Sequence, residues 1–224
     1  MTIEKVTKNE LISFIENNLK IRIDNLVESA FETAEEVHEG IKREDGKSSF
    51  LETHVWPVTL DVIKHYQSTN HLLTTLQISS TILHDVLEDN DRILDLYTSQ
   101  SYGFDAYFRH RFGEYVYDIA NKLKTKPLEN YQGSNNKEKE LARFFEYCSV
   151  LTNSKYDVKI IKLADRLNNM KFITHSPNNE KIKRYLREAE DFYIAFSLFP
   201  PQIPTLYHEM RKAYDELKII KITA

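Results

Sequence analysis

The sequence predicts an all-α protein of about ten helices, because its apolar side chains recur with the period of a helix rather than of a strand. Only five glycines and six prolines interrupt the 224 residues. A chain of this length can bury one sizeable core. We therefore expect a single domain over residues 1–224, without internal repeats.

The first half of the chain carries apolar stripes at helical spacing. The expected helices cover Lys8–Leu19, Asp24–Ile41, a segment that begins near His54, and residues 71–88. Pro57 favours a helix start near His54, because proline is tolerated in a first turn. Residues 42–49 are polar and contain Gly46, which is typical of a loop.

The second half continues the same pattern up to the C-terminal residues. Its expected helices cover Phe104–Phe112, Glu114–Lys124, Lys137–Leu151, Tyr156–Phe172, Glu180–Leu198 and Thr205–Leu217. Gly113 separates the first two, and residues 125–136 form the longest expected loop. No motif lies between residues 180 and 217, so we expect these helices to act as scaffold.

Composition restricts the function. Hydrophobic residues make up 41% and charged residues 29%, and the formal net charge is −4, which argues against nucleic acid as a partner. One cysteine, Cys148, and an N-terminus without a secretory signal favour the cytoplasm. No apolar stretch approaches the ~20 residues of a membrane span. The sequence predicts no oligomeric state.

The most informative stretch is Ile82-Leu83-His84-Asp85-Val86-Leu87-Glu88-Asp89. In a helix over residues 71–88, its ionisable residues would project from one side and its leucines from the other. The leucines expected to pack are Leu72, Leu76, Leu83 and Leu87. Burying His84 among three carboxylates is costly without a cation, and a divalent metal ion would supply the missing charge.

Further ligands for such an ion are expected elsewhere in the chain. His54 stands at the expected start of its helix, and Asp165 stands on a largely apolar helix face with Asn169. Each has a simpler interpretation. His54 could cap its helix, and Asp165 could form a salt bridge with a lysine or arginine.

Three segments together resemble a known family. They are His54, the block His84-Asp85-Val86-Leu87-Glu88-Asp89, and the block Lys162-Leu163-Ala164-Asp165-Arg166-Leu167-Asn168-Asn169-Met170. The order and spacing resemble the hydrolase domain of the Rel/SpoT alarmone synthetase/hydrolases and the stand-alone small alarmone hydrolases. These are HD-domain metal-dependent phosphohydrolases. The resemblance covers about residues 34–172.

The resemblance implies a helical HD-domain fold that binds one manganese ion. The implied metal ligands are His54, His84, Asp85 and Asp165. It also implies hydrolysis of the 3′-pyrophosphate of guanosine tetra- or pentaphosphate, with Glu88 and Asp89 positioning or deprotonating the attacking water. Arg43 would pack against the guanine base, and Asn169 would line the nucleotide pocket.

The implied reaction agrees with elementary chemistry. Two imidazoles and two carboxylates leave positions on manganese for water and a phosphate oxygen, and the ion lowers the pKa of that water. A strongly anionic substrate also requires cationic side chains near the site. Arg43 and Lys162 are the first candidates for this role.

Several presumed nucleotide contacts depart from the family pattern, which leaves alternatives open. Glu44 stands where a lysine is common, Asn121 replaces a threonine, Asn168 replaces a histidine and Phe172 replaces a threonine. A second hypothesis is therefore an HD-domain phosphohydrolase that acts on another nucleotide or phosphoester. A third is a non-catalytic module that binds a nucleotide.

Overall fold

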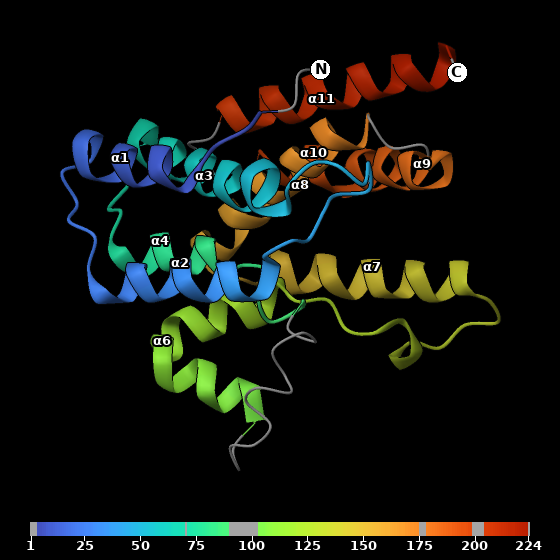
Figure 1. Cartoon of the computed structure of the whole chain (residues 1–224). Helices are drawn as coiled ribbons and strands as arrows, with labels where there is room; N and C mark the ends of the chain where they lie inside the picture. Colours follow the sequence, from blue (N-terminus) through green and yellow to red (C-terminus); the bar gives the residue numbers. More distant parts are fainter. Residues whose placement is uncertain (1–3, 70, 90–102, 175–177, 199–203, 224) are drawn as a thin grey trace.

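A computed structural model describes residues 4–69, 71–89, 103–174, 178–198 and 204–223 (Figure 1). The part of the chain that it describes contains no β-strand, and the all-α prediction is confirmed. The first helices are α1 (Lys8–Asn18), α2 (Asn25–His38), α3 (Trp56–Thr69) and α4 (Thr75–Ile82). Those that follow are α6 (Gly103–Leu123), α7 (Asn136–Thr152), α8 (Tyr156–Ile173), α9 (Asn179–Glu188), α10 (Ile194–Phe196) and α11 (Pro204–Thr223).

Helix α8 joins the two halves of the structure. It packs against α3, α6 and α11, while α4 packs against α2, α3 and α6 (Figure 1). Leu163, Leu167 and Met170 of α8 are fully buried, which follows from the apolar residues on most of its circumference. Side chains that α8 directs toward α3 therefore lie at the centre of the molecule.

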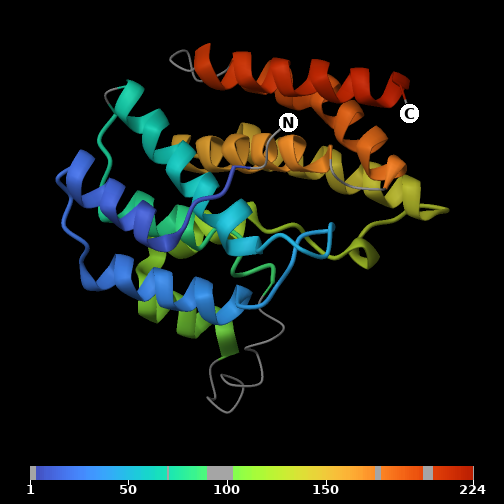
Figure 2. The same ribbon diagram turned by 45° about the horizontal axis from the view of Figure 1, so that its top comes forward.

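The predicted boundaries of the N-terminal helices agree closely with the structure. Thr7 caps α1 in a capping box with Glu10, and the Asp24 side chain accepts from Val27 N at the start of α2. The loop after α2 is closed by a backbone hydrogen bond from Gly46 N to Arg43 O, with Gly46 at φ 69°. This loop crosses to α9, where Lys181 pairs with Glu44 (Figure 2).

The prediction of one helix over residues 71–88 is wrong. Helix α4 ends at Ile82, and residues 83–88 form consecutive turns. The Thr81 carbonyl, which would accept from Asp85 N in a continuous helix, accepts instead from His84 N and from the His84 ring. Further turns follow from Val86 N to Leu83 O and from Glu88 N to Asp85 O.

The predicted leucine face is correspondingly only half right. Leu83 and Leu87 are buried, but Leu72 lies before α4 and is 81% exposed, and Leu76 is 37% exposed. The ionisable residues of this stretch therefore project from turns and not from one helix face.

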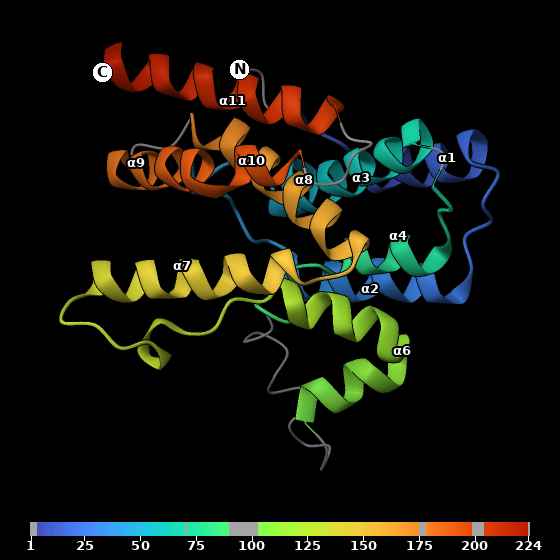
Figure 3. The same ribbon diagram turned by 180° about the vertical axis from the view of Figure 1, so that it is seen from behind.

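Gly113 bends α6 sharply, as its position between two predicted helices suggested (Figure 3). Its φ of 80° and ψ of 165° fall where only glycine is unstrained. The bend lets Phe108 and Phe112 on one side, and Val116 and Ala120 on the other, enter the same hydrophobic cluster. No helix in the described ranges is long and apolar enough to cross a bilayer.

Gly113→Ala should lower the free energy of unfolding by about 1–3 kcal/mol, because alanine is strained at this φ and ψ. A Cβ at residue 113 would meet no atom within 4 Å, so the loss would come from backbone strain alone. Urea unfolding measures it. The control His110→Ala, at an exposed position of α6, should change stability by less than about 0.5 kcal/mol. Equal midpoints for Gly113→Ala and wild type would contradict the strain.

Candidate metal centre

Three segments that are distant in the sequence bring the predicted metal ligands together. His54 lies in a π-helical turn, η1 (Leu51–Val55), which continues directly into α3. His84 and Asp85 lie in the turns after α4, and Asp165 lies in the middle of α8. The π-turn is a wider helical turn that often occurs at functional sites.

The donor atoms of these residues converge on one small region. His54 Nε2 lies 3.0 Å from Asp85 Oδ2, 3.3 Å from His84 Nε2 and 3.5 Å from Asp165 Oδ1. His84 Nε2 lies 3.2 Å from Asp85 Oδ2. Among the residues described, the single group of three metal-ligand types whose donor atoms lie within 4.8 Å of one another is His54, His84 and Asp85.

The other nitrogen of each imidazole makes a hydrogen bond outside this region. His54 Nδ1 lies 2.8 Å from Asn168 Oδ1, and His84 Nδ1 lies 2.8 Å from the Thr81 carbonyl oxygen. Both partners are acceptors, so both Nδ1 atoms carry the proton and donate. In the neutral rings, both Nε2 atoms therefore present lone pairs to the convergence point.

Such a set of lone pairs requires a cation. The two Nε2 atoms face the carboxylates of Asp85 and Asp165, and His54, His84 and Asp165 are all less than 5% exposed. Burial alone would lower the pKa of His84, but the Asp85 carboxylate outweighs it and raises the pKa to about 9. A positive charge is therefore favoured where these lone pairs converge, and the four residues fit a divalent metal ion.

Asp165 connects this group to a buried lysine. Its Oδ2 lies 2.7 Å from Lys162 Nζ, while its Oδ1 faces His54 and accepts from Asn169 Nδ2. Burial opposes ionisation of Asp165, yet the Lys162 ammonium holds its pKa below the ordinary value. The salt bridge considered as a simpler interpretation of Asp165 is thus present, and the carboxylate still faces His54.

Arg43 lies on the other side of the same network. Its guanidinium donates to Asn168 Oδ1 at 3.1 Å and to Asn169 Oδ1 at 3.0 Å. The guanidinium also stacks 4.0 Å from the centre of the Phe172 ring. A planar, buried guanidinium held by two amides offers a flat surface for a second aromatic group.

Glu88 and Asp89 are exposed, unlike the predicted ligands. Glu88 accepts hydrogen bonds from Thr125 Oγ1 at 2.7 Å and from Thr125 N at 3.3 Å. Asp89 Oδ2 lies 3.9 Å from His38 Nδ1. The two acids thus stand one turn beyond His84 and Asp85 but point to different neighbours.

Two residues of the centre were missed by the sequence reasoning. Asn168 accepts from both His54 and Arg43, and its Nδ2 donates to the Thr53 carbonyl at 3.1 Å. The position three residues after Asp165, on the same helix face, was the available signal. His38 ends the apolar stripe of α2. Its buried ring has no hydrogen-bond partner among the described residues, and burial lowers its pKa to about 4.

Two cavities adjoin the centre and share Tyr185. One, of about 200 Å³, is bordered by Arg43, Phe50, Asn169 and Phe172. The other, of about 230 Å³, contains Glu88 and Lys162. Its further charged residues are Arg143, Arg166, Arg184, Glu140 and Glu188. Arg143 forms no ion pair with any residue described, so this second cavity offers a cation that is free to bind an anion.

Comparison with known proteins supports the predicted resemblance. A solved structure of a metazoan ortholog of SpoT, which hydrolyzes ppGpp and plays a role in starvation responses, matches with a TM-score of 0.62. The match covers 87% of this chain and 97% of the other, at 14% sequence identity. The two proteins therefore share a fold.

A sequence match points in the same direction. Over 157 residues, 70% of this chain, it is 29% identical to a rice (Oryza sativa subsp. japonica) protein described as a chloroplastic GTP diphosphokinase of the RSH type. The match covers 16% of that much longer protein. No protein-family model matches the chain. The structural match thus confirms the fold that the resemblance implied, and the sequence match supports the relationship to Rel/SpoT-type proteins.

Asn168→Ala should weaken the binding of a divalent metal ion such as manganese by about 10–100-fold, because the imidazole of His54, a candidate ligand, loses the partner that orients it. Isothermal titration calorimetry of the metal-free protein measures this. Lys159→Ala, on the same helix, is the control and should bind manganese like wild type. An unchanged dissociation constant for Asn168→Ala would show that His54 is oriented without the amide.

Proposed function

We propose that this protein is a metal-dependent phosphohydrolase that removes the 3′-pyrophosphate from guanosine tetra- or pentaphosphate. The observation that carries the proposal is the convergence of His54, His84, Asp85 and Asp165 between two cavities. We call the cavity bordered by Arg43 and Phe172 the aromatic cavity, and the one that contains Lys162 and Arg143 the cationic cavity. The similarity to a ppGpp-hydrolysing protein in fold supports the choice of substrate.

In this proposal, the four converging residues hold one divalent ion, for which manganese suits the mixed nitrogen and oxygen donors. Such an ion, when bound, lowers the pKa of a water molecule and offsets charge on a phosphate. The protein contributes the fixed geometry. Asn168 and the Thr81 carbonyl hold the two imidazoles with their Nε2 atoms directed inward.

The substrate would occupy both cavities. Its base would stack against Arg43, whose orientation is fixed by Phe172 and Asn169. Its phosphates would lie near Lys162 and Arg143, where the positive charge of the second cavity opposes their repulsion. A neighbouring cavity bordered by Lys122, Lys124 and Lys126 shares Arg143 and extends this cationic surface.

Glu88 is our first choice for the general base, because its carboxylate borders the cavity that also contains Lys162. It would accept a proton from the attacking water, while Thr125 holds its position through two hydrogen bonds. Asp89, whose Oδ2 lies 3.9 Å from His38 Nδ1, would help to orient the attacking water.

A second candidate substrate is another phosphorylated nucleotide. Glu44 borders the aromatic cavity and pairs there with Lys181. Part of the positive charge that the protein would need around a highly phosphorylated guanosine is therefore neutralised. A less heavily charged nucleotide would suit this wall better.

Protein loaded with manganese should release pyrophosphate from guanosine tetraphosphate, and Asp85→Asn should abolish turnover by removing a ligand. A coupled pyrophosphate assay measures both. Asp215→Asn, a change of the same kind at an exposed position of α11, should keep full activity. Wild type that leaves this substrate intact but hydrolyses another nucleotide would favour the second candidate.

Glu88→Gln should lower kcat by about 10²–10⁴-fold with little change in KM, since the amide cannot accept the proton. Steady-state kinetics test this against Glu129→Gln, an exposed control that should match wild type. If Asp89→Asn lost more activity than Glu88→Gln, the roles of the two acids would be reversed.

A further inference from the structure

His38 is a fully buried histidine that no step of the proposed reaction uses. It is the last residue of α2, its side chain has no exposed surface, and both of its ring nitrogens lack a hydrogen-bond partner within the described ranges. Buried polar groups without a partner are rare in folded proteins, and each one requires an explanation. The surroundings of His38 indicate one.

The ring of His38 is held in place by the backbone and by packing. Ile41 N donates a hydrogen bond to His38 O at 3.1 Å, which fixes the backbone at the end of α2. The centre of the His38 ring lies 5.0 Å from the centre of the Phe50 ring, which in turn lies 4.8 Å from the centre of the His54 ring. Phe50 thus packs against both imidazoles, one of which belongs to a candidate metal ligand.

The ring also lies beside one of the two acids assigned to the attacking water. His38 Nδ1 lies 3.9 Å from Asp89 Oδ2, which is too long for a hydrogen bond. A movement of the Asp89 carboxylate by about 1 Å would bring the two atoms within hydrogen-bond distance. Hydrogen bonds that act in catalysis often shorten only when the enzyme binds its substrate.

The position of Asp89 also determines which ring nitrogen carries the proton. A lone pair on Nδ1 would face the Asp89 carboxylate, and the proton on Nε2 would then be buried without an acceptor among the described residues. A proton on Nδ1 avoids both costs. His38 therefore offers an N–H group to Asp89.

An acid that orients a water molecule must itself have a fixed orientation. Glu88 is held by the two hydrogen bonds from Thr125. Asp89 is held through its backbone N–H, which donates to Asp85 O at 3.0 Å, but its side chain is 43% exposed. A buried donor beside this side chain would limit its rotation, and His38 supplies such a donor.

We propose that His38 is a positioning residue, which holds the Asp89 carboxylate toward the attacking water by donating a hydrogen bond from Nδ1. The inference rests on the proposed function, because that function is what assigns Asp89 to the water. His38 acts through Asp89 and does not itself touch the substrate, because its side chain has no exposed surface.

Two substitutions of His38 separate this role from packing. His38→Phe keeps a ring against Phe50 but removes the donor, whereas His38→Asn keeps an N–H near the position of Nδ1 but removes the ring. In steady-state kinetics of the manganese-loaded full chain, His38→Phe should lower kcat by about 10–100-fold with little change in KM, as expected for the loss of a hydrogen bond to a charged group. His38→Asn should retain most of the activity.

Thermal unfolding should rank the two variants in the opposite order. An apolar ring in place of an unpaired buried imidazole costs little stability, while His38→Asn loses the packing against Phe50. If kcat follows the unfolding temperatures instead, His38 only packs and the proposal is wrong. His65→Phe is the matched control. It removes another buried imidazole, which contacts the Tyr156 hydroxyl, and should keep the kcat of wild type.

A double-mutant cycle tests whether His38 acts through Asp89. In an Asp89→Ala background, His38→Phe should lower kcat no further, because the carboxylate that it orients is already absent. The same fold-loss in both backgrounds would contradict the proposal. These kinetics use whichever nucleotide wild type hydrolyses, so a wrong choice of substrate does not affect the test of His38.

A second measurement needs no turnover. In nitrogen NMR spectra of isotope-labelled full chain loaded with zinc, a diamagnetic ion, the His38 ring should carry its proton on Nδ1, and Asp89→Ala should shift that resonance. A proton on Nε2, or an unchanged resonance, would overturn the contact even if guanosine tetraphosphate is hydrolysed. The expected spectra from a protein that leaves this nucleotide intact would support the contact and count against the proposed substrate alone.

Discussion

The structure depends on the accumulation of lone pairs where His54, His84, Asp85 and Asp165 meet. Neutral imidazoles whose Nδ1 atoms already donate can offer only acceptors at Nε2, and carboxylates add further negative charge. Such a group is stable in a buried position only with a proton or a metal ion at its centre. The local conformations around it serve this requirement. The π-turn carries His54 inward, and the end of α4 at Ile82 frees the Thr81 carbonyl for His84.

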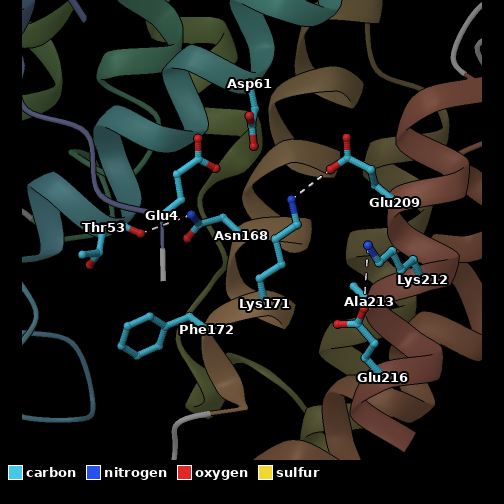
Figure 4. A pocket seen from close by; sticks show the side chains of 10 residues that line it. All are labelled: Glu4, Thr53, Asp61, Asn168, Lys171, Phe172, Glu209, Lys212, Ala213 and Glu216. Atoms are coloured by element: carbon cyan, nitrogen blue, oxygen red, sulfur yellow. Dashed lines mark hydrogen bonds and ion pairs between the residues drawn. The ribbon is translucent and has the colours of Figure 1, made fainter. Parts of the chain in front are cut away.

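Asn168 extends the influence of this centre to its surroundings. Its single side chain joins a candidate metal ligand, the guanidinium of Arg43 and the backbone of Thr53. Orientation of the metal ligand and orientation of the aromatic cavity are therefore not independent. The same side chain also borders a third cavity, of about 400 Å³, between the N-terminal segment, α3, α8 and α11 (Figure 4).

Much of this could be predicted from the sequence. The spacing of apolar residues predicts most helices to within a few residues, and the order of the motifs predicts that His54, His84, Asp85 and Asp165 lie together. The roles assigned to these residues remain predictions. Residues 71–88 were misjudged because periodicity cannot detect that a side chain competes for a backbone carbonyl. Leu72 was assigned to a packed face on the same mistaken assumption.

Other features depend on contacts between distant segments. The role of Asn168 requires η1 and the loop with Arg43 to approach α8, and the third cavity, which Asn168 also borders, requires Glu4 to lie near α11. Neither approach leaves a periodic or local signal in the sequence. The departures from the family pattern near the aromatic cavity can likewise be interpreted only from the structure, in which Glu44 pairs with Lys181 of α9.

The central claim is that these four side chains share one metal ion. Crystallography of manganese-loaded protein, with anomalous diffraction data, tests it most directly. We expect one strong anomalous peak within about 2.0–2.4 Å of the His54 and His84 Nε2 atoms and of oxygens from Asp85 and Asp165. A fully loaded crystal with its manganese elsewhere, or with no Asp165 oxygen among the ligands of the ion, would contradict it.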